Sequence, residues 1–482
     1  MARTNIEDLI EDIYDSGEGP EIAAFFDFDR TLISGFSAKA FMQEQLRERR
    51  LPAKAIASTL ASIAKYSAGR TNFSGFMAET TKHLAGETEA DLDEVGEKIF
   101  REKLVAAIYP EARALLEAHR EMGHTIAIVS SATKFQIEAA ARELGIEYIL
   151  CTDVEIEDGV LTGRVLSPTC FGKGKRTAAE DFSEDFGLDM NQSFFYTDSE
   201  DDLPLLDVVG RPRVVNPSKA LAKIARARTW KVCNFRDREK VKMLDLARAG
   251  SVYAMMPTSF ALSSPLWAVT RKKRPLLNVS TTIWAEAASA LVGLEYDIEG
   301  EEHIWSHRPA IFIFNHQSSI DTVIIAKLLR RDFTGIGKKE LKHFPIVGQA
   351  MQLSDVVFLD RSSPAKAIEA MRQAGETMIE KGLSLCLAPE GTRSVGRALG
   401  PFKKGAFHLA LQTKRPIVPI VIHNAADSQP SGNNIARPAK IRVTVLPPIP
   451  TKTWRLRSLN TKIAEVRQLY LDTLGQVDSQ SA

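Results

Sequence analysis

The sequence predicts an α/β protein with two α/β units in tandem. Short apolar runs alternate with helical stretches over residues 20–235, and the same alternation returns over residues 299–450. The chain has 482 residues, too many for one ordinary hydrophobic core. An uncharged stretch over residues 249–270 separates the two patterns. We therefore expect two domains with a helical segment of different character between them.

The amino-acid composition limits the classes of function that the protein can have. Lys and Arg number 62 against 61 Asp and Glu, and this balance disfavours a nucleic-acid binder, which carries a large basic excess. The N-terminus is acidic and lacks the apolar region of a signal peptide, which predicts a cytoplasmic location. The four cysteines form no CxxC pair and indicate reduced, structural thiols: Cys151, Cys170, Cys233 and Cys386.

Five apolar runs predict the strands of the first unit, residues 1–235. They read EIAAFFDFD, HTIAIVSSA, EYILCTD, QSFFYTD and RPRVVNP. In a mostly parallel sheet, active-site residues gather at the carboxyl ends of the strands. The Ala-rich pattern over about residues 33–109 is helical and predicts an inserted cap.

Two carboxylates end the first of these runs. Asp27 and Asp29 are two residues apart in FFDFDRT, so both side chains point to one face of a strand. Like charges this close require a cation or a shared proton. Magnesium fits, because it prefers oxygen ligands and bridges to phosphate.

The ends of later predicted strands, and the start of a predicted helix, carry side chains that suit a phosphate ligand. Ser130 offers a hydroxyl for a phosphate oxygen, and Lys175 offers an ammonium that could neutralise a phosphoryl group. Lys173 competes with Lys175 for this role, and spacing alone leaves the choice open. Asp198 and Asp202 follow another apolar run, FFYTDSEDD.

The order DxDxT, Ser, Lys, DSxxD resembles the haloacid dehalogenase (HAD) superfamily, in particular its phosphoserine-phosphatase-like branch, over residues 20–235. The resemblance implies a Rossmann-like domain with a helical cap that hydrolyses phosphomonoesters. It implies that Asp27 is the nucleophile and that Asp29 is the general acid and base. It also implies that Thr31 and Ser130 bind phosphate, while Lys175 steadies the nucleophile.

The same resemblance implies a magnesium site. Its ligands would be Asp27, the backbone carbonyl of Asp29, Asp198 and, through water, Asp202. One position departs from the family, because Phe36 stands where phosphoserine phosphatases usually carry a Glu that holds the substrate ammonium. Phosphoserine is therefore the alternative substrate, and a larger or more apolar phosphate ester is favoured.

Residues 236–250 are charged and predict a linker. Residues 251–298 predict a helical segment that associates with a membrane, with a re-entrant or interfacial helical pair favoured and a span left open. Pro257 and Pro265 interrupt the uncharged run, and a single span would place the two units on opposite sides of the bilayer. The cluster RKKR at 271–274 suits anionic headgroups. This favours the cytoplasmic face of the cell membrane, and an ordinary buried helical hairpin is the alternative.

The second unit, residues 299–482, carries a different constellation. Apolar runs again predict strands, and residues 454–474 predict one amphipathic C-terminal helix. His316 follows the run AIFIFN, and Asp321 lies five residues on. A carboxylate can fix the tautomer of such a histidine and stabilise its charged form. No nucleophilic side chain is needed if the substrate supplies a hydroxyl.

The order NHxxxxD, FLDR, PEGTR, PIVPI resembles the glycerophospholipid acyltransferases, most closely the 1-acylglycerol-3-phosphate type. The resemblance implies that His316, oriented by Asp321, deprotonates the sn-2 hydroxyl of a lysophospholipid, which attacks acyl-CoA or acyl carrier protein. It implies a phosphate-binding set made of Arg361, Glu390, Gly391, Thr392 and Arg393. Of these, Glu390 is better suited to orienting the loop than to chemistry.

The sequence thus predicts a bifunctional enzyme of phospholipid biosynthesis that couples an acyltransferase to a magnesium-dependent phosphatase. Two alternatives stay open: glycerol-3-phosphate as the acyl acceptor, and one domain acting as a non-catalytic regulatory module.

Overall fold

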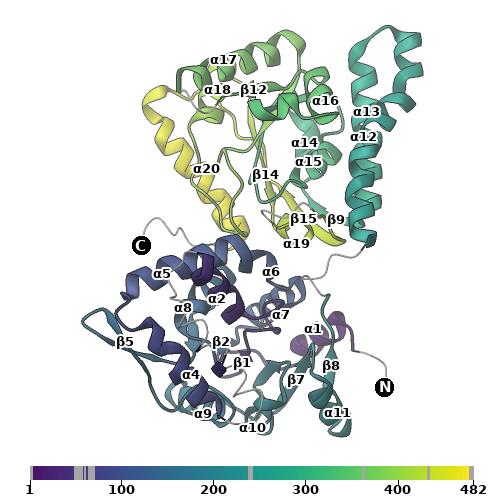
Figure 1. Cartoon of the computed structure of the whole chain (residues 1–482). Coiled ribbons are helices and arrows are strands. Elements are labelled where there is room, and N and C mark those ends of the chain that lie inside the picture. The colour runs from purple at the N-terminus through teal and green to yellow at the C-terminus, as the bar shows by residue number, and fades with distance from the viewer. Residues whose placement is uncertain are drawn as a thin grey trace. The chain divides into compact units, whose positions relative to one another are not determined.

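A computed structural model describes residues 4–47, 58, 61–62, 71–236, 243–360, 364–430 and 435–476. The chain divides into two compact units, Met1–Lys240 and Val241–Ala482 (Figure 1). Each unit has its own sheet and its own cores, so each is described by itself.

The first unit is built on a six-stranded parallel sheet of order β3-β2-β1-β6-β7-β8. Its strands are β1 (Ala23–Phe26), β2 (Thr125–Val129), β3 (Tyr148–Leu150), β6 (Phe194–Thr197), β7 (Arg211–Val215) and β8 (Lys231–Cys233). On β1, Ala24 and Phe26 join one hydrophobic cluster while Ala23 and Phe25 join another. The sheet is therefore buried on both faces, as its continuous apolar runs predict.

Helices cover both faces of this sheet (Figure 1). They are α1 (Ile6–Tyr14), α7 (Pro110–Glu121), α8 (Lys134–Leu144), α9 (Lys173–Phe186), α10 (Leu203–Leu206) and α11 (Lys219–Ala227). Because β1 and β6 are parallel neighbours, their carboxyl ends lie at the same edge. The residues that follow these two strands are thereby brought together.

The cap is helical in the residues that the structure describes. It contains α2 (Ser37–Arg47), α4 (Phe73–Thr81), α5 (Glu89–Ile99) and α6 (Val105–Ala107). Residues 48–57, 59–60 and 63–70 of the predicted cap lie outside the described part. A hairpin of β4 (Val154–Glu157) and β5 (Val160–Val165), which the sequence analysis did not predict, bonds to the cap where Gly86 N–H donates to the Leu161 carbonyl.

The second unit has a seven-stranded sheet of order β12-β11-β13-β10-β14-β15-β9. Its strands are β9 (Leu294–Glu299), β10 (Ile311–Phe314), β11 (Phe333–Lys338), β12 (Val357–Leu359), β13 (Ser384–Leu387), β14 (Ile417–Ile422) and β15 (Ala439–Val445). All neighbours are parallel except β14 and β15. The first strand of this unit, β9, therefore completes the sheet at an edge beside the last strand, β15.

The helices of this sheet are α14 (Glu302–Ser306), α15 (Asp321–Leu329), α16 (Val347–Leu353), α17 (Pro364–Lys381), α18 (Gly405–Thr413), α19 (Ala425–Ser428) and α20 (Leu459–Leu474). The C-terminal helix begins later than predicted, at Leu459, because a 3₁₀ turn over Leu456–Ser458 precedes it.

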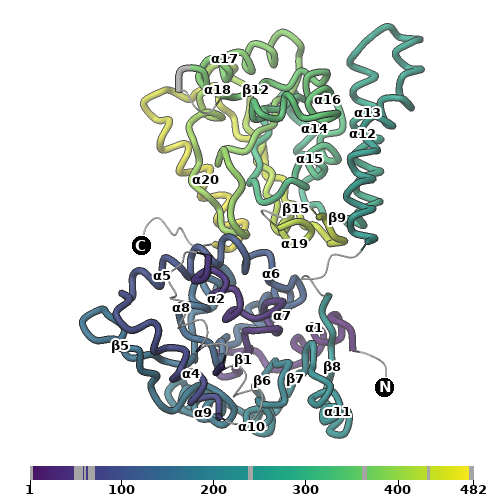
Figure 2. The backbone as a smooth tube through the Cα atoms, in the orientation of Figure 1, coloured from purple at the N-terminus to yellow at the C-terminus, as the bar shows by residue number. Residues whose placement is uncertain are grey.

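Two long helices form a hairpin at the start of this unit, α12 (Met243–Thr270) and α13 (Lys273–Val292) (Figure 2). Residues 243–250, assigned to the linker from sequence, are the first turns of α12, whose helical pattern simply continues through them. Residues 294–298, assigned to the helical segment, belong to β9, because Gly293 ends α13 with φ +81°. Among the described helices, none is long and apolar enough to cross a membrane.

Ion pairs join the start of α13 to Asp355, in the connection between α16 and β12. Lys273 Nζ and Arg274 Nη2 each lie 3.1 Å from the Asp355 carboxylate, and Lys381 Nζ lies 2.9 Å from it. Two of the four basic residues in the cluster at 271–274 are thus engaged within the protein. Arg271 instead lies over the Trp267 ring, 5.5 Å from its centroid.

Candidate active sites

The first site lies at the carboxyl edge of the sheet in the first unit. Asp27 follows β1, and its backbone N–H donates to the Tyr196 carbonyl of β6. Lys175 is buried and its Nζ lies 2.7 Å from Asp27 Oδ1 and 2.9 Å from Asp202 Oδ2. Thr197 Oγ1 donates to the same Asp202 oxygen at 2.5 Å. The sheet topology therefore assembles residues that are up to 175 positions apart in sequence.

The structure distinguishes the two candidate lysines. Both lie in the first turn of α9, but Lys173 is exposed and Lys175 is buried against the carboxylates. Burial alone would lower the pKa of the Lys175 ammonium, but Asp202 and Asp27 raise it above its usual value. Lys175 is therefore a permanent cation beside Asp27.

The Asp29 carboxylate is held by the first residue of the cap helix α2. Ser37 N–H donates to Asp29 Oδ1 at 2.7 Å, and Ser37 Oγ donates to Oδ2 at 3.1 Å. Burial raises the pKa of Asp29 to about 6, and the two Ser37 hydrogen bonds oppose this rise. A carboxyl group with such a pKa is suited to give and take protons near neutrality.

The carboxylate cluster is deeply buried and short of positive charge. Burial raises the pKa of Asp27 and of Asp198 to about 7 each, and the charge of Asp202 adds to both shifts. Arg30 Nη1 lies 2.9 Å from Asp198 Oδ2. With Asp29, four carboxylates thus face the two cations Lys175 and Arg30, which leaves a deficit that one divalent cation would neutralise.

The donor set therefore fits magnesium in charge and in atom type, since Mg²⁺ prefers carboxylate and carbonyl oxygens. Among the described residues, no three His, Cys, Asp or Glu side chains are already converged on a metal position. The phosphate-binding candidates are also in place. Ser130 and Thr31 are buried, and within the described chain Thr31 Oγ1 has no hydrogen-bond partner.

The second site contains a histidine–carboxylate pair. His316 follows β10, and its Nδ1 lies 2.8 Å from Oδ2 of Asp321, the first residue of α15. Asp321 is fully buried, and the same oxygen accepts the backbone N–H groups of Gln317 and Ser318 at 2.8 and 2.9 Å. An ionised carboxylate only accepts, so His316 Nδ1 carries the proton and its Nε2 lone pair stays available as a base.

The PEGTRS loop after β13 fixes the backbone of His316 from both sides. His316 N–H donates to Glu390 Oε1 at 2.8 Å, and the His316 carbonyl accepts Ser394 N–H at 2.7 Å. Glu390 Oε2 accepts the Gly400 N–H at 3.0 Å. Glu390 was placed in the phosphate-binding set from sequence. Both of its carboxylate oxygens accept backbone N–H groups, which favours the role of orienting the loop over contact with a phosphate.

Other residues of this loop remain available to an anion. Arg393 and Thr392 are exposed beside the histidine, and Arg393 Nη1 donates to Ser319 Oγ at 2.7 Å. Gly391 has φ +73°, and a Cβ there would approach the Lys403 side chain to 3.0 Å. Arg361, predicted as a second phosphate clamp, lies outside the described residues.

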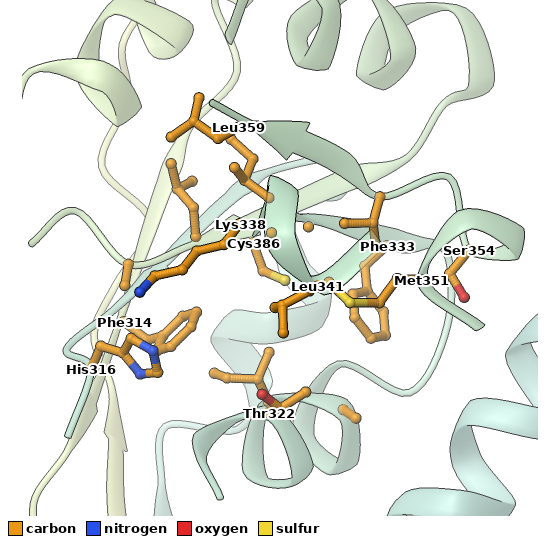
Figure 3. A pocket seen from close by; sticks show the side chains of 18 of the residues that line it. Phe314, His316, Thr322, Phe333, Lys338, Leu341, Met351, Ser354, Leu359 and Cys386 are labelled. Atoms are coloured by element: carbon orange, nitrogen blue, oxygen red, sulfur yellow. The ribbon is translucent and has the colours of Figure 1, made fainter. Parts of the chain in front are cut away.

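A large cavity opens in front of His316, with a volume of about 1340 Å³ (Figure 3). Its walls are mainly apolar and include Phe314, Phe333, Leu341 and Met351. Lys338, which the sequence analysis did not single out, extends through this cavity towards Phe314 and His316 (Figure 3). The GIGKKEL segment carries no recognisable motif spacing, so only the position of Lys338 at the end of β11 could have indicated it.

The sequence matches two family models. Residues 24–207 match the haloacid dehalogenase-like hydrolases, and residues 295–423 match the acyltransferases. The chain is 39% identical to the 1-acyl-sn-glycerol-3-phosphate acyltransferase of Limnanthes alba over 184 residues. This aligned stretch is 38% of this chain and 65% of that protein. Over 193 residues it is 35% identical to an uncharacterized acyltransferase of Schizosaccharomyces pombe, covering 40% of this chain and 69% of that protein.

Two solved structures are each similar to part of the chain. A 1-acyl-sn-glycerophosphate acyltransferase from Thermotoga maritima is 23% identical, with a TM-score of 0.41, over 49% of this chain and 98% of that one. A protein of unknown function from Bordetella pertussis Tohama I is 28% identical, with a TM-score of 0.42, over 44% of this chain and 98% of that one.

The sites and the family matches define an α/β protein with a haloacid dehalogenase-like hydrolase domain followed by an acyltransferase domain. The chain belongs to the acyltransferase family. It spans about two thirds of the length of the first curated relatives that it matches.

Proposed function

We propose that the chain is a bifunctional enzyme of phospholipid biosynthesis. Its second domain would acylate the sn-2 hydroxyl of 1-acylglycerol-3-phosphate with acyl-CoA or acyl carrier protein as donor. Its first domain would be a magnesium-dependent phosphomonoesterase. The observation that carries the acyl-transfer proposal is the His316–Asp321 pair at the wall of the apolar cavity. At about 1340 Å³ this cavity exceeds the roughly 300–1,000 Å³ of ordinary small-molecule sites, which suits long acyl chains.

In the proposed acyl transfer, His316 Nε2 takes the proton from the acceptor hydroxyl as its oxygen attacks the thioester carbon. The carbon–sulfur bond then breaks, and the thiolate leaves with the proton from His316. Asp321 stabilises the imidazolium through its 2.8 Å contact with Nδ1. Thr392, Arg393 and Lys338 supply donors for the acceptor phosphate, which turns the hydroxyl towards His316.

In the proposed phosphatase reaction, Asp27 attacks phosphorus and Asp29 protonates the leaving oxygen. Asp29 then activates the water that hydrolyses the aspartyl phosphate, which returns Asp27 to its starting state. Lys175 supports the nucleophile, and Thr31 and Ser130 bind phosphate oxygens. Asp27, Asp198, the Asp29 carbonyl and, through water, Asp202 would hold Mg²⁺, which would supply charge neutralisation for the phosphoryl group.

Site-specific substitutions test both activities. His316→Ala should lower thioester-dependent acylation of 1-acylglycerol-3-phosphate by ~10²–10⁴-fold and leave phosphate release unchanged. Asp27→Asn should do the reverse. His307→Ala, an exposed histidine whose Nδ1 contacts only Ser306 among the described residues, is the matched control. If either active-site substitution removes both activities from a folded protein, the two sites are not independent.

We also propose that the α12–α13 hairpin holds the enzyme on the cytoplasmic face of the cell membrane. Leu262, Trp267 and Val269 of α12 are exposed apolar side chains near the cluster at 271–274. Since Lys273 and Arg274 pair with Asp355, the residues to substitute are Arg271 and Lys272. Changing both to Ser should weaken flotation with anionic vesicles, most clearly at low salt. Unchanged flotation would place the anchor on another surface.

A further inference from the structure

Positive charge is concentrated in two short segments of the acyltransferase domain. Residues 401–415 and 451–467 together carry nine Lys or Arg and one Glu, although Lys and Arg number 62 against 61 Asp and Glu in the whole chain. The surface of these two segments is called the basic face. Its exposed cations are Lys403, Lys404, Lys414, Arg415, Lys452, Arg455 and Arg457. A surface with such an excess of one sign attracts a partner of the opposite sign.

The two segments are bound to each other, so their charges belong to one surface. Thr451 Oγ1 donates to the Arg415 carbonyl at 2.7 Å, and Lys414 Nζ donates to the Trp454 carbonyl at 3.3 Å. The Trp454 ring stacks on Phe407 of α18, with the ring centroids 6.2 Å apart. The start of α20 is thereby held beside α18.

The charge of the basic face is left without neutralisation. In the part of the chain that the structure describes, none of its seven exposed cations is paired with a carboxylate. Lys462 of α20, by contrast, lies 2.6 Å from Glu465. A pocket of about 360 Å³ opens between the two segments, with Lys404 on one wall and Asn460 and Arg467 on the other. The pocket could receive an acidic side chain of a partner.

The basic face begins at the proposed acyl-transfer site. Lys403 lines the cavity in front of His316, and its neighbour Lys404 lines the pocket of the basic face. The Lys403 backbone N–H donates to the Pro389 carbonyl at 2.8 Å, which joins this end of the face to the PEGTRS loop. A partner bound to the basic face would therefore lie next to the catalytic cavity.

The basic face and the α12–α13 hairpin lie on opposite sides of the sheet. On β10, Ile311 and Ile313 pack with Tyr470 of α20 in one hydrophobic cluster. Phe312, on the other face of the strand, packs with Ala288 of α13. Figure 1 shows α20 and the hairpin on the two sides of the second unit. Because the proposed membrane contact is the hairpin, the basic face is left to a soluble partner.

We propose that the basic face docks an acidic carrier protein that bears the acyl thioester, so that acyl carrier protein is the donor for this enzyme. This inference rests on the proposed acyl transfer and names its donor. The exposed cations extend over two helices and the segments that flank them, which suits a protein surface better than one nucleotide. The flexible arm of the carrier would bring the thioester past Lys403 to His316.

Binding of unacylated acyl carrier protein to the full-length enzyme tests the docking without turnover. Arg455→Glu with Arg457→Glu should weaken this binding ~10-fold or more at low salt, measured by fluorescence anisotropy of the labelled carrier. Both side chains are exposed, and neither lines the catalytic cavity. The matched control is Lys223→Glu with Arg226→Glu, an equal change of charge at exposed positions of α11. It should bind the carrier as the parent does, and added salt should weaken the binding of both.

Turnover with two donors of the same acyl chain separates a docked protein from other ligands. In the Arg455→Glu, Arg457→Glu variant, KM for acylated carrier protein should rise ~10-fold or more, and KM for acyl-CoA should stay within about twofold of the parent. An equal rise for both donors would overturn the proposal, because the cations would then contact the pantetheine arm that the donors share.

Three other results would also overturn the proposal. They are unchanged carrier binding in this variant, a parent enzyme that binds no carrier protein, and a larger loss of flotation with anionic vesicles than in the α11 control, which would make a membrane the occupant. Failure of the acyl-transfer proposal would look different: carrier protein would bind to the parent and dissociate from the variant, but neither donor would be turned over.

Discussion

The hydrogen bonds of Glu390 allow a sharp prediction about how the acyltransferase site is held. Each carboxylate oxygen accepts one backbone N–H, from His316 at 2.8 Å and from Gly400 at 3.0 Å. Glu390→Gln keeps the shape of the side chain but replaces one acceptor oxygen by an NH₂ donor. One buried N–H then faces a donor and loses its partner, at a cost of ~1–3 kcal/mol.

The lost hydrogen bond changes the position of His316, and no contact with the substrate is removed. A displacement of about 1 Å at a catalytic group can lower a rate ~10²-fold. We expect Glu390→Gln to lower kcat for acyl transfer ~10–100-fold, with little change in KM for the acyl thioester. The assay is thioester-dependent product formation, with phosphate release as the internal control and Glu465→Gln, a substitution on the exposed face of α20, as the matched control. A folded variant with kcat within about twofold of the parent would refute this positioning role.

The same residue predicts a dependence of stability on pH. Burial raises the pKa of Glu390 from its ordinary value of 4.5 to about 7, so the folded protein holds this proton more tightly than the unfolded chain. The resulting stabilisation is complete below pH 4.5 and is lost as the pH rises through 7. The shift corresponds to about 3 kcal/mol. Denaturant unfolding of the acyltransferase domain between pH 4.5 and 7.5 should show this decline, and Glu390→Gln should flatten it.

Three further predictions concern the phosphatase domain. Lys175→Ala should abolish phosphate release. It should also lower the free energy of unfolding of this domain, measured in urea, by ~3–5 kcal/mol, because Asp27 and Asp202 lose their buried partner. A loss below about 1 kcal/mol would contradict the pairing. Chelation of metal ions with EDTA should stop phosphate release and leave acyl transfer unchanged, and added Mg²⁺ should restore phosphate release. Phosphate release that survives exhaustive chelation would show that the phosphatase needs no metal ion. Phosphoserine should be a poorer substrate than glycerol phosphates or lysophosphatidic acid, because Phe36 has no carboxylate to pair with an ammonium group and the repelling Arg30 guanidinium already lies over its ring at 5.9 Å. A far higher kcat/KM for phosphoserine would reverse this assignment.

The parts of the fold that sequence predicted best are those with continuous apolar runs. AAFF in β1 and IVPIVI in β14 are wholly buried strands, and their patterns are unambiguous. β11 was missed because FTGIGK contains two glycines, which have low strand propensity. β9 was missed because LEYDIE is half polar, as suits an edge strand with one solvated face.

The contacts of the site residues could be predicted from sequence only where residues close together in the chain determine them. The His316–Asp321 spacing places both groups at one strand–helix turn, so local sequence was enough to predict their contact. The choice of Lys175 over Lys173 depended on the direction in which α9 meets β1, which no local pattern encodes. The backbone role of Glu390 depended on the Gly400 N–H, ten residues away in a loop without regular structure.

The position of β9 has a practical consequence for fragment work. A fragment that starts at residue 299, where the sequence analysis placed the domain, would omit nearly all of Leu294–Glu299. Five successive residues of β15, from Ala439 to Val443, would then lose their partners and leave a row of open hydrogen-bonding groups. An uncovered strand of this length is a template for self-association. Expression of the isolated domain should therefore begin before Gly293, so that insoluble product is not mistaken for an inability of the acyltransferase to fold alone.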